Sequence, residues 1–445
     1  MGRYFGTDGM RGKVGEAPMT VDFAVRLAST AGRVLTPNGG SVLVGKDPRI
    51  SGYMFEAALE AGFIAAGVDV KLLQVMPTPA IAFLTRVLGA DLGVVISASH
   101  NPYEDNGIKF FDRTGSKLSD ELEASIEQAL EEPVRTNHSS RLGRAERRYD
   151  AVDRYQTFCR QTVPADVNLS GLRIVVDCAN GATYKVAPRV FSDLGADIIS
   201  IGCSPNGRNI NDECGSTAPA HLQRTVTALG AQLGIAFDGD GDRVAMVDER
   251  GQLVDGDDLL YIIALQRKLE QKLRGPVVGT LMSNLGLERA LKAQGVAFER
   301  VAVGDRYVMA RLHERAGILG GETSGHVICL DRTTTGDGIV SALQVLATMH
   351  SSGESLAQLR AGLEKYPQVM INVRVARRFD PFSSDAVKAA VRDVERALGD
   401  RGRVVLRASG TEPLIRVMVE GEDESRIRAH AEQLAHAVSG AVPAS

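Results

Sequence analysis

The segment SVLVGKDPRISGYMFEAALEAGFIAAGVDVKLL (residues 41–73) gives the clearest indication of the fold class. It opens with an apolar run, continues through the Ala/Leu-rich segment 55–67 and closes with a β-rich run at 68–73. The two runs have the composition of strands, and the segment between them has that of a helix. A helical connection of this length joins parallel strands, and runs with little polar alternation fit a sheet covered on both faces. The stretch therefore predicts a βαβ unit.

The same succession of segments occurs twice more along the chain. LRIVVDCANG, KVAPRVFSDLG and ADIISIG lie within residues 172–202, and PVVGTLMSNLG, LERALKAQG and VAFERVAVG lie within residues 276–304. A chain of 445 residues is longer than one hydrophobic core usually organises, and an apolar content of 44% is enough for several cores. We expect three tandem α/β domains with mixed sheets.

The C-terminal part has a different pattern. From about residue 369, two helical segments (385–398 and 425–440) alternate with a strand and a hairpin, RVVLRASGTEPLIRVMVE. This β-α-β-β-α order predicts a smaller α+β domain. The expected domains span residues 1–155, 156–255, 256–367 and 368–445.

The charge balance argues against a nucleic-acid partner. The chain has 51 Lys and Arg residues against 55 Asp and Glu residues, a net charge of −4, with no block of like charge. Its start, MGRYFGTDGMRG, lacks the apolar core of a secretory signal and the Arg/Ser-rich character of a transit peptide. No run of about 18 apolar residues follows. We expect a cytoplasmic protein that binds neither nucleic acid nor a membrane.

The cysteines indicate neither a disulfide framework nor a zinc site. They are odd in number, scattered, and without a CxxC pair. We expect reduced thiols with structural roles at Cys159, Cys178, Cys203, Cys214 and Cys329.

The segment ISASHNPYEDNGIKFFDRTG (96–115) is the first that suggests chemistry. An apolar strand leads into a polar turn that presents Ser99, His100 and Asn101. Such strand-end loops are where α/β proteins place reactive side chains, although a serine there also commonly caps a helix or closes a turn. A Ser–His hydrolase is disfavoured, because adjacent residues do not easily form the nucleophile–base hydrogen bond and the flanks are not GxSxG.

FDGDGDR (237–243) places three carboxylates, Asp238, Asp240 and Asp242, directly after the apolar strand LGIAF. The glycines let the backbone turn sharply, so that alternate carboxylates converge on one hard cation; without a cation they would repel one another. Magnesium fits best, because so few carboxylates leave room for water and phosphate oxygens. A calcium EF-hand is excluded, because Arg243 stands where that loop needs glycine and a strand leads in.

RASGTEPLIR (407–416) has the groups that phosphate oxygens require. Arg407 and Arg416 supply forked donors. Backbone N–H and hydroxyl groups come from Ser409, Gly410 and Thr411. A hairpin turn with solvated arginines is the alternative when the loop is considered alone.

Two more groups are candidates for proton transfer or charge neutralisation. In GGETSGH (320–326) a carboxylate and a hydroxyl suit sugar hydroxyls, and His326 can transfer a proton at neutral pH; a structural histidine is the alternative. Lys109 can neutralise phosphate charge, or act as an acid/base if neighbouring cations lower its pKa; a solvated lysine is the alternative. The glycine-rich loops GKDPRISG (45–52) and TTTGDG (333–338) receive no role.

Taken in order, GTDGMRG, SASHNP, DGDGDR, GETSGH and RASGTEPLIR resemble the signature of the α-D-phosphohexomutase family over the whole chain. The resemblance implies a heart-shaped arrangement of three α/β domains and a smaller fourth. Thr323 stands where the mannose/glucose-type members carry methionine. Together with the opening GTDGMRG, this favours the members that act on glucosamine phosphate.

The resemblance also implies roles for individual residues. Ser99 would be the phosphoserine, and Glu322 and Ser324 would hold the sugar hydroxyls. One Mg²⁺ per chain would be bound by Ser99, Asp238, Asp240 and Asp242. The catalytic centre would be lined by Arg11, His100, Lys109, Arg243 and His326. The non-reacting phosphate would be held by Arg407, Ser409, Gly410, Thr411 and Arg416.

These implications combine into an expected activity. Phospho-Ser99 would phosphorylate O1 of glucosamine 6-phosphate, and the resulting glucosamine 1,6-bisphosphate would turn over and return its O6 phosphoryl group to Ser99. The product, glucosamine 1-phosphate, would supply UDP-N-acetylglucosamine for the cell envelope. The first phosphate would come from a bisphosphorylated sugar or an activating kinase, and the chain would be a monomer or homodimer. The alternatives are a phosphomannomutase or phosphoglucomutase, a sugar-phosphate hydrolase and a non-catalytic sugar-phosphate sensor.

Overall fold

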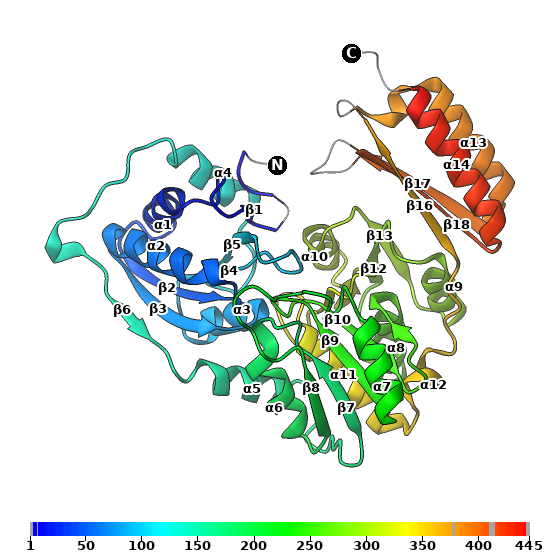
Figure 1. Cartoon of the computed structure of the whole chain (residues 1–445), viewed down its shortest axis with the longest axis horizontal. Helices are drawn as coiled ribbons and strands as arrows, with labels where there is room; N and C mark the ends of the chain where they lie inside the picture. Colours follow the sequence, from blue (N-terminus) through cyan, green and yellow to red (C-terminus); the bar gives the residue numbers. More distant parts are fainter. Residues whose placement is uncertain (1–2, 7, 376–378, 409–413, 442–445) are drawn as a thin grey trace.

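Three α/β domains are followed along the chain by a smaller α+β domain (Figure 1). The structure is a computed structural model that describes residues 3–6, 8–375, 379–408 and 414–441. Each of the first three sheets joins parallel pairs to antiparallel ones, whereas the described strands of the fourth pair only antiparallel. The predicted fold class is confirmed, and the exact domain limits stay a prediction.

The first domain has a six-stranded sheet in the order β1-β5-β4-β2-β3-β6. Alternate residues of β2 separate two apolar layers: Val42 and Val44 pack with α1 and α2, and Leu43 packs with α3. Both faces are therefore covered, as the sequence predicts. The elements are β1 (Met10–Lys13), α1 (Val21–Leu35), β2 (Gly40–Lys46), α2 (Ile50–Ala66), β3 (Val68–Val75), α3 (Thr78–Val87), β4 (Leu92–Ile96), β5 (Asp105–Asp112), α4 (Asp120–Ala129) and β6 (Ala145–Arg147).

The second domain has a five-stranded sheet in the order β11-β10-β9-β7-β8. Strands β7, β8 and β9 are parallel, and β10 returns antiparallel to β9 through the acidic turn. Leu222 and Val226 of α7 cover one face of the sheet. The elements are α5 (Ala151–Gln161), β7 (Arg173–Asp177), α6 (Ala187–Ser192), β8 (Asp197–Ile201), α7 (Ala220–Leu229), β9 (Leu233–Phe237), β10 (Val244–Asp248) and β11 (Leu253–Val254).

The third domain has a four-stranded sheet in the order β13-β12-β14-β15. Its apolar core is continuous with that of the second domain and with the α3 face of the first, so these three domains pack as one body. The elements are α8 (Gly256–Leu269), β12 (Val277–Thr280), α9 (Leu285–Ala293), β13 (Phe298–Val301), α10 (Asp305–Glu314), β14 (Leu319–Gly321), β15 (Val327–Cys329), α11 (Gly338–Ser352) and α12 (Leu356–Arg360).

The C-terminal domain has its own apolar core, between a sheet in the order β16-β18-β17 and two helices. The helices lie on the face of the sheet that is turned away from the rest of the chain (Figure 1). Arg403 ties this domain to the third, because its guanidinium donates to the carbonyl oxygens of Leu281 (2.7 Å) and Ser283 (2.6 Å). The elements are β16 (Gln368–Arg374), α13 (Asp385–Leu398), β17 (Gly402–Ala408), β18 (Leu414–Gly421) and α14 (Glu424–Gly440).

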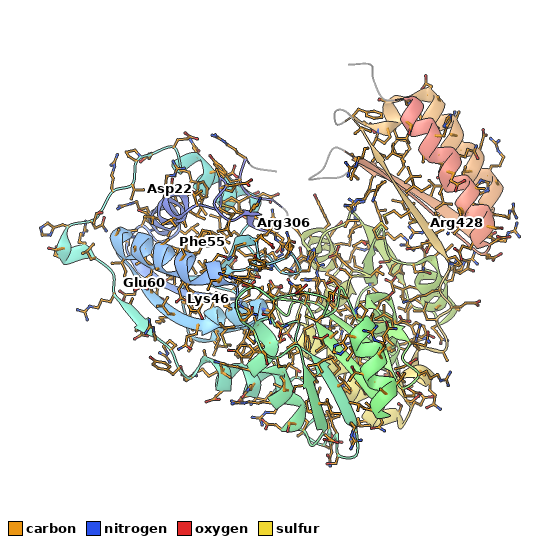
Figure 2. The ribbon with its side chains drawn as sticks, viewed as in Figure 1. Asp22, Lys46, Phe55, Glu60, Arg306 and Arg428 are labelled. Atoms are coloured by element: carbon orange, nitrogen blue, oxygen red, sulfur yellow. The ribbon has the colours of Figure 1, made fainter. Side chains whose placement is uncertain are left out.

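Ion pairs join the first domain to the third. Lys117 Nζ lies 2.6 Å from Asp305 Oδ2, and Arg306 Nη2 lies 2.8 Å from Glu123 Oε1. Arg306, the second residue of α10, is labelled in Figure 2 close to the first domain. Within the described part of the chain, we find no helix with the length and apolarity needed to cross a membrane.

Candidate active site

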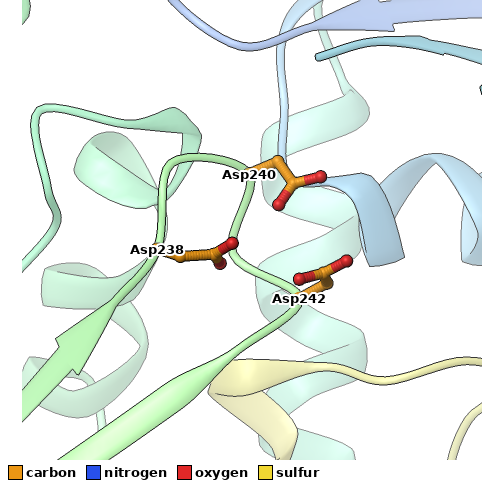
Figure 3. Close-up of side chains that lie close together, drawn as sticks. All are labelled: Asp238, Asp240 and Asp242. Carbon is orange, nitrogen blue, oxygen red and sulfur yellow. The ribbon is translucent and has the colours of Figure 1, made fainter. Parts of the chain in front are cut away.

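The acidic turn after β9 brings three carboxylates together (Figure 3). One oxygen from each of Asp238, Asp240 and Asp242 lies within 4.8 Å of the others, and all three residues are buried. Gly241 has a left-handed backbone (φ 75°), and a Cβ at Gly239 would lie 2.5 Å from the carbonyl oxygen of Ser99. The convergence expected from the glycine spacing is therefore present. Gly241 supplies the left-handed turn, and Gly239 leaves room for the Ser99 loop.

The electrostatics of this cluster fit a bound divalent cation. Burial and the neighbouring charges of Asp242 and Asp240 raise the pKa of Asp238 well above its usual range. Asp240 Oδ1 and Asp242 Oδ1 are buried and have no hydrogen-bond partner among the described residues. Buried carboxylate oxygens without a partner are costly unless they pair or bind a cation, and oxygen ligands are those that Mg²⁺ takes.

Ser99 lies against this cluster, three residues beyond the end of β4. Its Oγ donates to Asp238 Oδ2 at 2.5 Å, and the residue is 1% exposed. Its backbone is left-handed (φ 52°), which is uncommon for a residue with a Cβ. His100 Nδ1 lies 3.4 Å from Ser99 Oγ, a longer contact than an ordinary hydrogen bond between these groups. Burial, and then Arg243 and Arg11, lower the pKa of His100 to about 4, so it is neutral at neutral pH.

Lys109, on β5, is buried among carboxylates. Its Nζ lies 2.8 Å from Asp240 Oδ2, 2.9 Å from Asp8 Oδ2 and 3.6 Å from Asp242 Oδ2. Burial opposes the charge, but these carboxylates outweigh it and raise the pKa of Lys109. The solvated-lysine alternative is therefore wrong. The charge of Arg11 has the opposite effect, but the carboxylates dominate, and this environment favours charge neutralisation over acid/base use.

His326 faces two carboxylates from different elements. Its Nδ1 lies 3.6 Å from Asp242 Oδ2, and its Nε2 lies 3.4 Å from Asp305 Oδ2. Burial opposes protonation, yet Asp242 and Asp305 raise the pKa of His326 to about 9. The ring packs on Gly336, where an added Cβ would lie 2.3 Å from Nε2. These contacts favour the protonated form of His326.

Two arginines complete the positive side of the site. Arg11 pairs with Asp8, and Arg243 Nε lies 3.9 Å from Asp242 Oδ1. Burial opposes the charge of Arg243, but Asp242 and Asp238 raise its pKa. The Nε atoms of both arginines are buried without a hydrogen-bond partner in the described part of the chain. These donors suit an anionic ligand such as a phosphate.

The predicted sugar loop follows β14. Glu322 Oε1 accepts from the Gly304 N–H at 3.1 Å, and Ser324 is exposed. Thr323 Oγ1 donates to Asp257 Oδ2 at 3.0 Å. The hydroxyl of Thr323 is therefore used within the fold, while Glu322 and Ser324 retain exposed surface.

The described part of the predicted phosphate loop lies on two paired strands. Arg407 on β17 is the register partner of Arg416 on β18. Burial and the charge of Arg416 lower the pKa of Arg407, and the charge of Glu322 has the opposite effect. Arg407 therefore lies within the electrostatic reach of Glu322 in the sugar loop. The three predicted ligands between the strands lie outside the described residues: Ser409, Gly410 and Thr411.

Family models match four consecutive parts of the chain. They are those of phosphoglucomutase/phosphomannomutase alpha/beta/alpha domain I (2–136), domain II (153–251) and domain III (255–366), and of the C-terminal domain (370–437). The chain belongs to the phosphoglucomutase/phosphomannomutase family. The resemblance inferred from the sequence motifs is confirmed.

Curated members of this family are similar along their whole length. The phosphoglucosamine mutase of Nitrosococcus oceani is 61% identical, with 98% of this chain and 97% of the relative covered. That of Thioalkalivibrio sulfidiphilus is 58% identical, with 98% of each covered.

Solved structures share the fold. A family protein from Burkholderia thailandensis superposes with a TM-score of 0.81 at 24% identity, over 99% of this chain and 98% of the other. The N-acetylphosphoglucosamine mutase of Aspergillus fumigatus, solved in complex with GlcNAc-6P and magnesium, gives 0.70 at 20% identity, over 99% and 96%.

Further residues at the site are not indicated by any of the predicted ligand or catalytic positions. Thr78 Oγ1 donates to Asp240 Oδ2 at 2.6 Å, and Asp8 forms ion pairs with Lys109 and Lys117. Asp8 lies within the GTDGMRG motif (6–12), whose resemblance to the family signature could have indicated it. Thr78 and Lys117 stand in no motif, so only packing brings them to the site.

The described thiols are free, as expected.

Proposed function

We propose that the protein interconverts glucosamine 6-phosphate and glucosamine 1-phosphate through a phosphoserine at Ser99. The observation that carries the proposal is the 2.5 Å contact between Ser99 Oγ and Asp238 Oδ2 within the buried acidic cluster. A serine hydroxyl fixed beside a cation site is suited to carrying a phosphoryl group. The choice of glucosamine is supported by the 61% identity to a phosphoglucosamine mutase over 98% of the chain.

The acidic cluster would hold one magnesium ion. Its ligands would be Asp238, Asp240, Asp242 and phospho-Ser99. When bound, the ion supplies neutralisation of the charge on the transferring phosphoryl group. Lys109 Nζ keeps its proton and compensates Asp240 and Asp8, which fixes these carboxylates in place. Arg11, Arg243 and protonated His326 add fixed positive charge where an anionic substrate enters.

The remaining loops would fix the sugar. Glu322 and Ser324 would hold its hydroxyls, and the non-reacting phosphate would bind to Arg407, Ser409, Gly410, Thr411 and Arg416. Because catalysis here depends on alignment and charge, one phosphate site can serve both orientations of a glucosamine 1,6-bisphosphate intermediate. The first phosphate on Ser99 would come from a bisphosphorylated sugar or an activating kinase. A cytosolic location and a monomeric or homodimeric state belong to the same proposal.

Turnover of glucosamine phosphate, compared with glucose and mannose phosphates, tests this function. We expect the highest kcat/KM on glucosamine phosphate, and one added phosphate in the intact mass that is removed by the sugar monophosphate. Ser99→Ala should lose both while keeping the fold. A higher kcat/KM on mannose or glucose phosphate would show that the substrate is that sugar phosphate and not glucosamine phosphate. Stoichiometric release of inorganic phosphate would indicate a hydrolase, and ligand binding with no phosphoserine would indicate a sensor.

A further inference from the structure

Two side chains from different domains bind the same two carbonyl oxygens of the Ser99 loop. Arg49 Nη2 donates to Ser99 O at 2.9 Å and to Asn101 O at 2.8 Å. Asn211 Nδ2 donates to Ser99 O at 2.9 Å and to Asn101 O at 3.1 Å. Arg49 comes from the loop before α2 in the first domain, and Asn211 comes from a loop of the second. The backbone of the serine is therefore held from both domains.

The guanidinium of Arg49 donates to carbonyl oxygens of the loop that carries Ser99 and to the carboxylate of Asp47. Arg49 is 0% exposed, and its Nη1 donates to Asp105 O at 3.0 Å and also to Pro102 O. Its Nε donates to Asp47 Oδ2 at 2.8 Å. Its planar fork of five N–H donors serves four carbonyl oxygens and the Asp47 carboxylate at once, whereas the ammonium of a lysine has only three donors.

The carboxylate of Asp47 is also linked, through Ser97, to the backbone N–H of Ser99. Asp47 Oδ2 accepts from Ser97 Oγ at 2.6 Å, and Ser97 Oγ accepts from the Ser99 N–H at 2.9 Å. All four residues of this chain of contacts are buried. Both the N–H and the carbonyl of Ser99 are thus fixed by the GKDPR segment, a loop to which the sequence assigned no role.

Asn211 relates the serine loop to the acidic turn. Its own backbone is left-handed (φ 58°), and its N–H donates to Ala179 O at 2.9 Å. A Cβ at Gly239 would lie 2.8 Å from Asn211 Nδ2 and 2.5 Å from Ser99 O. The amide, the serine carbonyl and the acidic turn are therefore in mutual contact, so a shift of Asn211 moves the serine relative to the carboxylates.

We propose that Arg49 and Asn211 are positioning residues for phosphoryl transfer, which hold Ser99 in the left-handed conformation that directs Oγ to Asp238. This inference rests on the proposed function. The φ of 52° at Ser99 is disfavoured for a residue with a Cβ and persists only when its surroundings impose it. Neither side chain is among the groups expected to bind the sugar. Their loss should therefore lower kcat and leave KM unchanged.

Asn211 offers the cleaner test, because it is only half-buried and lies in a loop. Asn211→Gly removes the two N–H donors of the side-chain amide, and glycine tolerates the left-handed backbone. Asn211→Asp keeps the shape of the side chain but replaces the donating nitrogen by an oxygen that faces the carbonyls of Ser99 and Asn101. We expect kcat to fall by about 10- to 100-fold, since a misplacement of about 1 Å costs on that order, with KM and Tm unchanged. Asn168→Gly is the matched control. Its side chain accepts from the Ser170 N–H in the same domain, and kcat should stay at the wild-type value.

Arg49→Lys and Arg49→Met give a graded second series. We expect kcat in the order Arg, Lys, Met, at constant KM. Single-turnover transfer from phosphorylated enzyme to glucosamine 6-phosphate should slow in the same order, while the phosphorylated fraction is unchanged. Because Arg49 is buried beside Asp47, its variants are compared only at equal amounts of folded protein. If the Arg49 variants do not fold, the two Asn211 variants alone test the positioning role.

The outcomes separate this inference from the proposed function. A wild-type protein inactive on every sugar phosphate would refute the function. A wild-type protein that is active, with wild-type kcat in Asn211→Asp, would overturn the positioning role. The inference would also be overturned if activity fell only in proportion to the loss of folded protein, because that result describes a purely structural contact.

Discussion

Ser99 Oγ and Asp238 Oδ2 lie 2.5 Å apart across the boundary between the first two domains, although 139 positions separate the residues in sequence. One follows β4 and the other follows β9, so the contact depends on how the two sheets pack. A phosphoryl group on Ser99 would bring about two negative charges against a carboxylate cluster that is already buried. Phosphorylation and cation binding at this site must therefore be coupled.

The first prediction is that phosphorylated protein binds Mg²⁺ more tightly than unphosphorylated protein. The added charge favours the cation, and a coupling of this kind typically changes affinity by about 5- to 150-fold. The measurement is the shift in Tm on titrating Mg²⁺ into the two forms, separated by intact mass. Ser99→Ala should behave as the unphosphorylated form. Equal affinities in both forms would contradict the coupling.

The second prediction concerns Asp238→Asn. Because burial and two neighbouring carboxylates raise the pKa of Asp238, the neutral amide should raise the Tm of the metal-free protein. The same change removes a ligand, so Mg²⁺ should no longer raise the Tm and mutase activity should be lost. Asp166→Asn, a change at an exposed carboxylate, should leave both Tm values as in the wild type. An unchanged Mg²⁺ response in Asp238→Asn would exclude this residue as a ligand.

The third prediction concerns Lys109→Met. Removing one partner of a buried ion pair costs about 3–5 kcal/mol, because the remaining charges lose their compensation. We expect a large fall in Tm and in activity, and only partial recovery in Lys109→Arg, since the planar guanidinium is larger than the compact ammonium and this position is buried. Lys388→Met, at a largely exposed pair with Asp385, should cost less than about 1 kcal/mol. Equal effects of the two Met variants would refute the structural role of Lys109.

Much of the fold, and part of the candidate active site, could be predicted from patterns of residues that are close together in the sequence. The βαβ repeats were predictable because burial on both faces leaves uninterrupted apolar runs, as in β2, and because strand ends mark reactive loops such as that of Ser99. The convergence of the acidic residues followed from the glycines between them. In each case the decisive residues are neighbours in sequence.

Contacts between distant segments were not predictable. Lys117 and Asp305 meet only because α10 packs beside the first domain, and nothing in their own surroundings in the sequence indicates it. The sequence left Lys109 open between charge neutralisation, acid/base use and solvation, because its environment is formed by Asp8 and Asp240, from two other segments. Asn211 carries no motif, and its role depends on the approach of the second domain to Ser99.

The last prediction is a pH dependence from Asp337, which caps α11. Burial raises its pKa from 3.8 to about 6, although Tyr155 Oη donates to it at 2.7 Å and the Val340 N–H donates at 3.0 Å. Because the folded state binds this proton more tightly than the unfolded state, the contribution of Asp337 to stability falls as pH rises from about 4 to about 6. The amide introduced by Asp337→Asn does not titrate, so the variant does not lose this stability. Its Tm minus that of the wild type should therefore increase from about pH 4 to about pH 6, by an amount that corresponds to about 2–3 kcal/mol in the free energy of unfolding. Tyr155→Phe, which removes a donor to the carboxylate, should steepen the wild-type decline. A Tm difference between Asp337→Asn and the wild type that does not change with pH would show that this carboxyl keeps its ordinary pKa.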